Sequence, residues 1–330
     1  IEIRQLRMRF ATPDGSFDAV DGADRDIAAR KTVCLVGESG SGKSVTARAI
    51  LRLLAVNAQG SGSIHYRAAD GREQDLATLD PKGREIRAIR GRDIGMIFQE
   101  PMSSLSPVHT IGSQMQEAVR LHLGLKGKPA RERCIEMLAR VGIPQPQTRI
   151  DSYAFQMSGG MRQRAMIAMA LVCKPRVLIA DEPTTALDVS IQAGILDLIR
   201  ELQAEMGMAV LFITHDLGVV AQVADSLAVM YLGRVVEQAG VTDIFDDPCH
   251  PYTRALLNSI PRAARQRKTA IAAIRGMIPN PLERPGGCTF HPRCDHFMQG
   301  VCDTAVPPLL TLAPGRAVRC ALYAEPVATP

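Results

Sequence analysis

Short apolar runs alternate with longer stretches of helical periodicity over much of this chain. Four runs have the length and continuous apolar character of buried strands, and they cover residues 32–36, 94–98, 176–180 and 209–214. Apolar residues recur at helical spacing over 45–54, 111–123, 130–141, 161–172, 189–205 and 217–224. Residues 229–236 are typical of a hairpin that turns at Gly233. Because strands and helices alternate, we predict an α/β fold.

Two stretches depart from this alternation. The segment from about 100 to 164 reads as helical throughout, which indicates a helical subdomain inserted between the two halves of the α/β pattern. Beyond residue 260 the chain becomes irregular, and ten of its 21 prolines lie there. We therefore predict one domain over residues 1–260 and a separate C-terminal extension over residues 261–330.

Composition narrows the class of protein. Hydrophobic residues make up 46% of the chain and charged residues 22%, which is typical of a folded globular protein. No run approaches the roughly 18 to 20 apolar residues that a membrane span needs, and the first residues do not resemble a signal peptide, so we expect a cytoplasmic location. The last 70 residues account for the net charge of +5, and a basic segment can bind nucleic acid. The chain has no Trp on which a base could stack, however, so we expect no nucleic-acid partner.

Residues 37–44 read G-E-S-G-S-G-K-S and match the pattern of a phosphate-binding loop. They follow a predicted strand and precede a predicted helix, which is the context that such a loop requires. We expect Lys43 to reach the β- and γ-phosphates and Ser44 to bind Mg²⁺. The nucleotide-binding residues predicted here are Gly37, Glu38, Ser39, Gly40, Ser41, Gly42, Lys43 and Ser44.

Two carboxylates end the apolar run at 177–180. Asp181 and Glu182 would lie at the carboxyl end of a buried strand, where ligands bind in open α/β sheets. Asp181 suits a contact with Mg²⁺ through water, and Glu182 suits a general base that holds the attacking water. With the phosphate loop, these residues predict hydrolysis of a nucleoside triphosphate.

Residues 157–164 read M-S-G-G-M-R-Q-R and resemble the signature sequence of the ATP-binding-cassette (ABC) ATPases, with Met157 in place of the usual Leu. Ser158, Gly159 and Gly160 precede a predicted helix whose N-terminus favours an anion. The resemblance implies a P-loop NTPase cassette that hydrolyses ATP. It also implies that the signature of one subunit closes over the phosphate loop of another, so that hydrolysis needs a dimer.

Further positions resemble landmarks of the same family and take their roles from it. Gln99 resembles the glutamine that touches Mg²⁺ and water and links to the membrane partner. Asp188 resembles the acid that contacts the opposite subunit, and His215 resembles the histidine that contacts the γ-phosphate. Either Phe10 or Phe17 is expected to stack on adenine, and the sequence does not decide between them.

Three segments narrow the resemblance to the ATP-binding subunits of dipeptide, oligopeptide and nickel importers: 98–107, 181–189 and 250–257. This implies ATP hydrolysis coupled to solute import, at the cytoplasmic face of a bacterial inner membrane. The implied partners are two integral membrane permease subunits, a second ATPase subunit (a paralogue or a second copy) and an extracytoplasmic substrate-binding protein. The alternative is a soluble ABC ATPase acting on nucleic acid or ribosomes, although such proteins usually carry a coiled-coil insertion or two fused cassettes. The solute itself is not encoded in this chain.

Half of the eight cysteines lie in the extension, and they are Cys288, Cys294, Cys302 and Cys320. Residues 291–294 read H-P-R-C, and members of the resembled group can carry a 4Fe–4S cluster on such cysteines. Four thiolates suit that cluster, and they also suit a zinc ion, so an iron–sulfur site, a zinc site and free thiols remain alternatives. A bound metal would supply folding free energy to a proline-rich segment with little core of its own.

Overall fold

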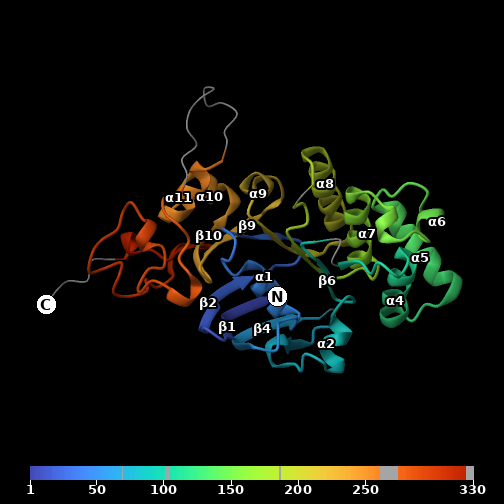
Figure 1. Ribbon diagram of the computed structural model, residues 1–330, viewed down its shortest axis with the longest axis horizontal. Coiled ribbons are helices and arrows are strands. Elements are labelled where there is room, and N and C mark those ends of the chain that lie inside the picture. The colour runs from blue at the N-terminus through green and yellow to red at the C-terminus, as the bar shows by residue number, and fades with distance from the viewer. Residues whose placement is uncertain (69, 101–103, 186, 261–273, 325–330) are drawn as a thin grey trace. The chain divides into compact units, whose positions relative to one another are not determined.

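The computed structural model describes residues 1–68, 70–100, 104–185, 187–260 and 274–324 (Figure 1). These residues form two compact units. The first unit combines Ile1–Asp26, Val33–Tyr66 and Thr214–Pro330, and the second combines Ile27–Thr32 and Arg67–Ile213. Each unit therefore contains segments that are far apart in the sequence, and each is described by itself below.

An antiparallel sheet forms one part of the first unit. Strand β1 (Glu2–Thr12) pairs with both β2 (Gly15–Asp26) and β4 (Ala58–Arg67), and the three lie together at the lower edge of Figure 1. The ladder between β1 and β2 shifts register near Gln5, where the backbone has a φ of 47°. The backbone N–H of Gln5 donates to the carboxylate of Asp24 at 2.8 Å, so the bulge keeps a hydrogen-bonded backbone.

A second run of strands carries the phosphate loop. Strand β3 (Thr32–Val36) is fully buried and runs parallel to β9 (Ser226–Tyr231), which continues through a hairpin into β10 (Arg234–Gly240). The neighbouring helices of this unit are α1 (Lys43–Ile50), α9 (Leu217–Val223), α10 (Val241–Asp246) and α11 (Pro251–Asn258). The predicted strand at 32–36 and the hairpin at Gly233 are confirmed.

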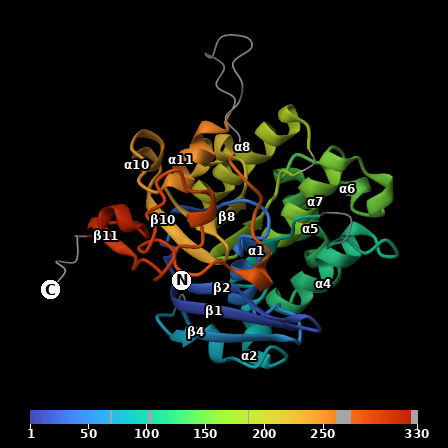
Figure 2. The same cartoon turned by 60° about the vertical axis from the view of Figure 1, so that its left-hand side comes forward.

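The described part of the C-terminal extension is built onto this unit. Strand β12 (Arg316–Val318) pairs antiparallel with β10 and with β11 (Leu310–Ala313). Figure 2 shows the segment that carries β11 beside β10. The rest of the described extension consists of connecting segments with single 3-10 turns at Pro281–Glu283, His291–Arg293 and Ala321–Tyr323. The irregular character expected from the prolines is largely correct, but the extension also supplies two strands.

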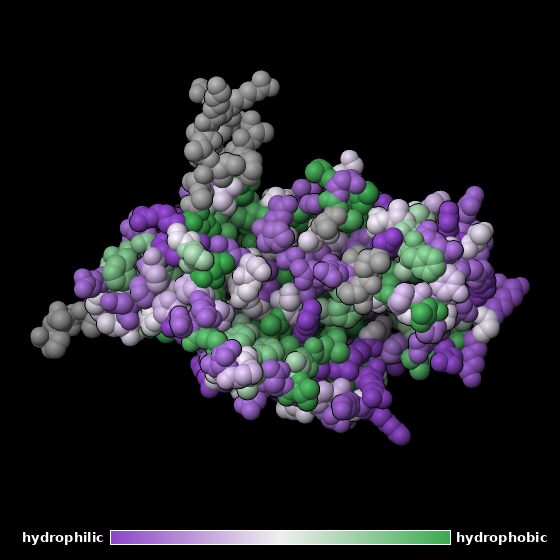
Figure 3. Space-filling view, viewed as in Figure 1, coloured by the Kyte–Doolittle hydropathy of each residue, from purple (hydrophilic) through white to green (hydrophobic). Residues whose placement is uncertain are grey.

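The second unit holds three parallel strands and most of the helices. Strand β7 (Val177–Asp181) lies between β6 (Ile94–Ile97) and β8 (Ala209–Thr214), and all three are buried. The helices of the inserted segment are α4 (Ile111–Leu123), α5 (Gly127–Arg140), α6 (Pro146–Arg149) and α7 (Gly159–Leu171), and α8 (Val189–Met206) follows β7. Smaller elements of this unit are β5 (Glu73–Asp75), α2 (Arg84–Ile89) and the 3-10 helices Leu76–Thr78 and Ala154–Gln156. Figure 3 shows mostly hydrophilic side chains over the end that carries α4 to α6.

Local capping explains several element boundaries. Helix α4 spans the predicted residues, because Thr110 caps its start and Gly124, with a φ of 69°, ends it. The prediction for α1 was wrong at both ends. This helix begins at Lys43, directly after Gly42 with its φ of 101°, and it ends at Ile50, because Arg52 has a φ of 54°.

None of the helices among the described residues combines the length and the apolar composition that crossing a lipid bilayer requires.

Candidate functional site

The phosphate loop at 37–44 connects β3 to α1, and its backbone depends on glycine. Gly37, Gly40 and Gly42 have φ values of 155°, 77° and 101°. A Cβ atom on Gly37 would lie 2.2 Å from the carbonyl oxygen of Met230, and one on Gly42 would lie 2.3 Å from that of Ala19. The loop is therefore packed so closely against neighbouring backbone that only glycine fits at these two positions.

Lys43 is 4% exposed, and its amine is turned into the loop. The Nζ atom donates to the carbonyl oxygen of Gly37 at 2.7 Å and to that of Glu38 at 3.0 Å. It also lies 3.3 Å from Oγ of Ser41, which is buried as well, while Ser39 and Gly40 at the tip are exposed. The structure thus holds a positive charge inside a loop whose tip is open to solvent, as phosphate binding requires.

In the second unit, the carboxylate of Glu182 is held by two neutral donors. The side-chain amide of Gln99 donates to Oε2 at 3.1 Å, and the hydroxyl of Thr185 donates to the same oxygen at 2.9 Å. The backbone N–H of Glu182 donates to the carbonyl oxygen of Ile213 at 2.9 Å. The preceding residue, Asp181, is fully buried at the end of β7. The structure therefore brings Gln99 and Glu182 together, and the two hydrogen bonds hold the Glu182 carboxylate beside the amide of Gln99.

The signature residues form the start of α7. The hydroxyl of Ser158 caps the helix by accepting the N–H of Met161 at 3.4 Å. Ser158 and Gly159 are exposed, and a Cβ atom on Gly159 would meet no atom within 4 Å, whereas Gly160 packs against Ile191. An exposed pair of residues at a capped helix N-terminus leaves room for an anion to approach.

Three other predicted residues have defined surroundings. Asp188 caps α8, since its carboxylate accepts the N–H of Ile191 at 2.9 Å. His215 is exposed directly after Thr214. The rings of Phe10 and Phe17 stack on each other with centroids 5.8 Å apart, so both lie at one place on the antiparallel sheet. Their roles toward nucleotide and partner subunit stay predictions, and residues 101–103 and 186 of the resembling segments lie outside the described residues.

The family described as ABC transporter matches residues 20–185, just over half of the chain. A Brucella melitensis protein described as a peptide import ATP-binding protein is 49% identical, over 98% of this chain and 97% of that protein. This chain belongs to the ABC transporter family. The predicted P-loop cassette fold is thereby confirmed.

Further comparisons extend this assignment along the chain. The family described as oligopeptide/dipeptide transporter, C-terminal region, matches residues 236–302 of this ABC protein. A Sinorhizobium fredii protein described as a peptide ABC transporter ATP-binding protein is 48% identical over 97% of this chain and 94% of its own. The structure also resembles the ATP-binding cassette MJ0796, solved as a dimer bound to ADP and Pi, with a TM-score of 0.64 and 25% identity over 73% of this chain and 98% of that one.

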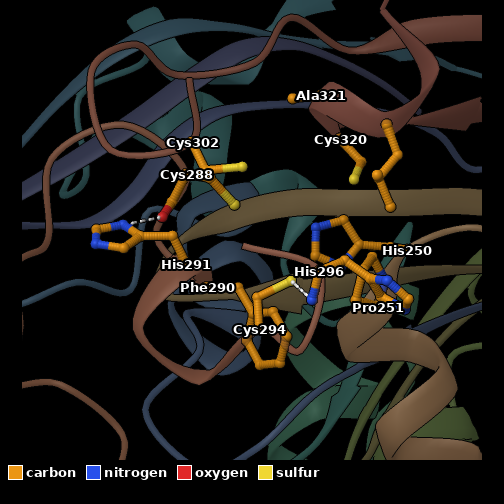
Figure 4. A pocket seen from close by; sticks show the side chains of 11 residues that line it. His250, Pro251, Cys288, Phe290, His291, Cys294, His296, Cys302, Cys320 and Ala321 are labelled. Atoms are coloured by element: carbon orange, nitrogen blue, oxygen red, sulfur yellow. Dashed lines mark hydrogen bonds between the residues drawn. The ribbon is translucent and has the colours of Figure 1, made fainter. Parts of the chain in front are cut away.

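The four cysteines of the extension of this ABC protein line one pocket. Figure 4 shows Cys288, Cys294, Cys302 and Cys320 around a common space, with their sulfur atoms turned toward it. Burial raises the pKa of the Cys320 thiol to about 11, and it also raises the pKa of Cys288 and Cys294. In the part of the chain that the structure describes, no group of three or more His, Cys, Asp or Glu side chains is arranged to hold a metal ion.

The pocket is closed on one side by aromatic and imidazole rings. His250 is completely buried, and burial lowers its pKa to about 3, so the ring is neutral and its Nδ1 accepts the N–H of Tyr252 at 3.0 Å. Phe290 packs edge-on against His250 with centroids 5.9 Å apart. The backbone N–H of His296 lies 3.4 Å from the sulfur of Cys294, a contact that would stabilise a thiolate.

Some residues of the site were not predicted from the sequence. Thr185 holds Glu182, and the buried side chain of Gln163 in α7 donates to the carbonyl oxygen of Pro183, next to that glutamate. The contact of Gln163 joins segments that are distant in the sequence, and the contact of Thr185 lies within an irregular loop. Hydrophobic periodicity predicts neither contact. Arg293, within the H-P-R-C element, contacts Glu38 of the phosphate loop and was likewise not singled out.

Proposed function

We propose that this protein is the ATP-binding and ATP-hydrolysing subunit of an ABC importer for peptides or a related solute. The observation that carries the proposal is the match of one chain to both the ABC transporter family and the oligopeptide/dipeptide transporter C-terminal region. The names of its relatives, one of which refers to peptide import and the other to a peptide ABC transporter, support the same solute class.

The chemistry assigned to the chain is the attack of water on the γ-phosphate of ATP. The phosphate loop would hold the triphosphate, with Lys43 neutralising the β- and γ-phosphates. Glu182 would accept a proton from the attacking water, and Gln99 would orient both the water and the carboxylate. His215 would contact the γ-phosphate. Mg²⁺, bound through Ser44, Gln99 and Asp181, would supply charge neutralisation of the triphosphate.

A second ATPase subunit would complete each site. We assign the exposed Ser158 and Gly159, together with Gly160, to the phosphates of ATP bound on the partner subunit, and Asp188 to contact across the same interface. Their positions at capped helix N-termini support this assignment. The partner is a paralogue or a second copy of this chain, and Phe10 or Phe17 would stack on adenine.

The proposal places the protein peripherally, at the cytoplasmic face of a bacterial inner membrane and against two permease subunits. A substrate-binding protein on the other side of the membrane would then select the solute. The match to the C-terminal region of oligopeptide and dipeptide transporters favours this role over a soluble ABC ATPase acting on nucleic acid or ribosomes.

Affinity purification from gently solubilised membranes tests this role. We expect multi-span membrane proteins to co-purify with the tagged chain, and we expect ATP hydrolysis by the complex to be stimulated by the solute and its binding protein. A matched purification with a tagged enzyme that does not bind membranes shows the background. If only nucleic acid or ribosomal proteins co-purify, the import proposal fails.

We further propose that the four-cysteine pocket binds a 4Fe–4S cluster. Four thiols that surround a common space supply the ligand set of such a cluster, and the same four thiols would also suit a zinc ion. Protein purified without oxygen should be brown and contain about four irons per chain.

Replacing Cys294 by Ser should remove the iron and the brown absorbance, because the cluster loses one of its four ligands. The matched control is Cys134→Ser, which changes a buried cysteine of α5 and should keep the full iron content. Elemental analysis of both variants measures the result. Wild-type protein that contains zinc, or no metal, would contradict the cluster.

A further inference from the structure

Glu38, the second residue of the phosphate loop, is held by side chains from far along the chain. Arg293 forms a two-pronged ion pair with its carboxylate, with Nη1 2.8 Å from Oε2 and Nη2 3.2 Å from Oε1. The backbone N–H of Glu38 donates to the phenolic oxygen of Tyr252 at 2.9 Å. Both the backbone and the side chain of this loop residue are therefore fixed from outside the loop.

The guanidinium of Arg293 is itself tightly held. The side chain is 4% exposed, and its Nε donates to the carbonyl oxygen of Arg275 at 2.8 Å. The guanidinium carbon lies 5.8 Å from the ring centroid of Tyr231 and 5.9 Å from that of Phe290. A planar group that is stacked and hydrogen-bonded in this way keeps one orientation, so little entropy is lost when it pairs with a carboxylate.

The segment that carries Arg293 also forms part of the wall of the four-cysteine pocket. Arg293 directly precedes Cys294, and Phe290 both lines the pocket and lies beneath the arginine. Phe290 also packs against Tyr252, with ring centroids 5.3 Å apart. The two groups that hold Glu38 thus share their packing with the pocket, and a change in the fold of the pocket would reach the phosphate loop through them.

A second arginine of the extension, Arg284, contacts the phosphate loop indirectly, through the residues beside it. Nη2 of Arg284 donates to the carbonyl oxygens of Asp18 at 2.5 Å and Leu232 at 2.6 Å. The adjacent N–H of Gly233 donates to the carbonyl oxygen of Ser41 at 2.9 Å. The extension therefore supports the loop at Glu38 directly and at Ser41 through the turn of the β9–β10 hairpin.

From these contacts we infer that Arg293 is a positioning residue for ATP binding. Through its ion pair with Glu38, Arg293 holds the phosphate loop in the shape that receives the triphosphate, so nucleotide affinity depends on the folded C-terminal extension. The pair also neutralises a carboxylate that would repel the phosphates. This inference rests on the proposed ATPase function.

A double-mutant cycle on the full-length chain tests the inference, with the dissociation constant for a non-hydrolysable ATP analogue and the melting temperature as readouts. Arg293→Gln should weaken binding about tenfold, within the usual range of coupling between sites. In the Glu38→Gln background, the same change should cost less than about twofold, because the group through which Arg293 acts is already gone. Arg293→Lys should weaken binding less than Arg293→Gln, because Lys keeps the positive charge beside Glu38. It should still weaken binding, because an amine cannot make the two parallel hydrogen bonds of the guanidinium.

The matched control is Arg316→Gln, which removes a partly buried arginine of the same extension that pairs with Asp247. It should leave nucleotide affinity unchanged. If wild-type protein does not bind the analogue, the proposed function fails. If it binds and Arg293→Gln binds equally well, or loses the same affinity with and without Glu38, only this inference fails. Should Arg293→Gln not fold, the Lys variant in both backgrounds provides the same comparison.

Discussion

Replacing Glu182 by Gln is expected to slow ATP hydrolysis by at least about 100-fold while ATP still binds, the usual effect of losing a general base. Glutamine has nearly the same shape, but its amide does not accept a proton from water. The two donors on Oε2, from Gln99 and Thr185, find an amide oxygen in the same place. The fold should therefore be kept, and the defect should be confined to the chemical step.

Phosphate release under saturating ATP measures this loss, and size-exclusion chromatography measures its consequence. Because bound ATP is no longer consumed, the variant should accumulate as an ATP-bound dimer. The control is Glu201→Gln, which changes an exposed glutamate of α8 and should hydrolyse ATP at the wild-type rate. Turnover by Glu182→Gln within about twofold of wild type would mean that another group is the base.

Replacing Gly42 by Ala is expected to weaken ATP binding by at least about 100-fold, a loss of about 2.7 kcal/mol of binding free energy. The position has a φ of 101°, where a side chain costs roughly 1–2 kcal/mol. The new Cβ atom would also lie 2.3 Å from the backbone oxygen of Ala19. The backbone oxygen of Ala19 cannot move aside as the end of a flexible side chain can. The start of α1 must therefore move, and Lys43 moves with it.

Calorimetric titration with ATP measures the affinity, and thermal unfolding shows whether the variant is folded. The matched control is Gly315→Ala, which introduces a side chain at a φ of 76° in the same unit, where a Cβ atom meets nothing within 4 Å. It carries a similar backbone cost but should bind ATP as wild type does. An unchanged affinity of Gly42→Ala would show that the loop adapts and that its close packing is not needed for binding.

The fold was predictable where local sequence and burial agree. The runs at 32–36 and 209–214 are strands with the predicted limits, because continuous apolar residues suit a strand that is buried on both faces. The limits of α1 were not predictable, because they depend on left-handed backbone at Gly42 and Arg52. Strand β12 was missed for a different reason. It consists of three residues, and its partner β10 lies about 80 residues earlier in the chain.

The residues of the candidate site likewise include some that the sequence indicated and some that it did not. The phosphate loop and Glu182 could be proposed from the sequence because a motif concentrates several chemical requirements in one short segment, and their roles stay predictions. Thr185 and Arg293 were missed because a single polar residue in an irregular loop shows no pattern. Only the folded chain reveals that Arg293 meets Glu38, which lies 255 residues away in the sequence.

The pairing of β12 with β10 has a consequence for how this unit meets other proteins. Among the described residues, the outermost strand on this side is β11, which has four residues and lies in the segment between Pro308 and Pro314. A short strand beside prolines is a poor template for the strand of another chain. Sheets of two copies are thus discouraged from joining edge to edge on this side, because the extension covers β10 with a strand that offers few free backbone groups.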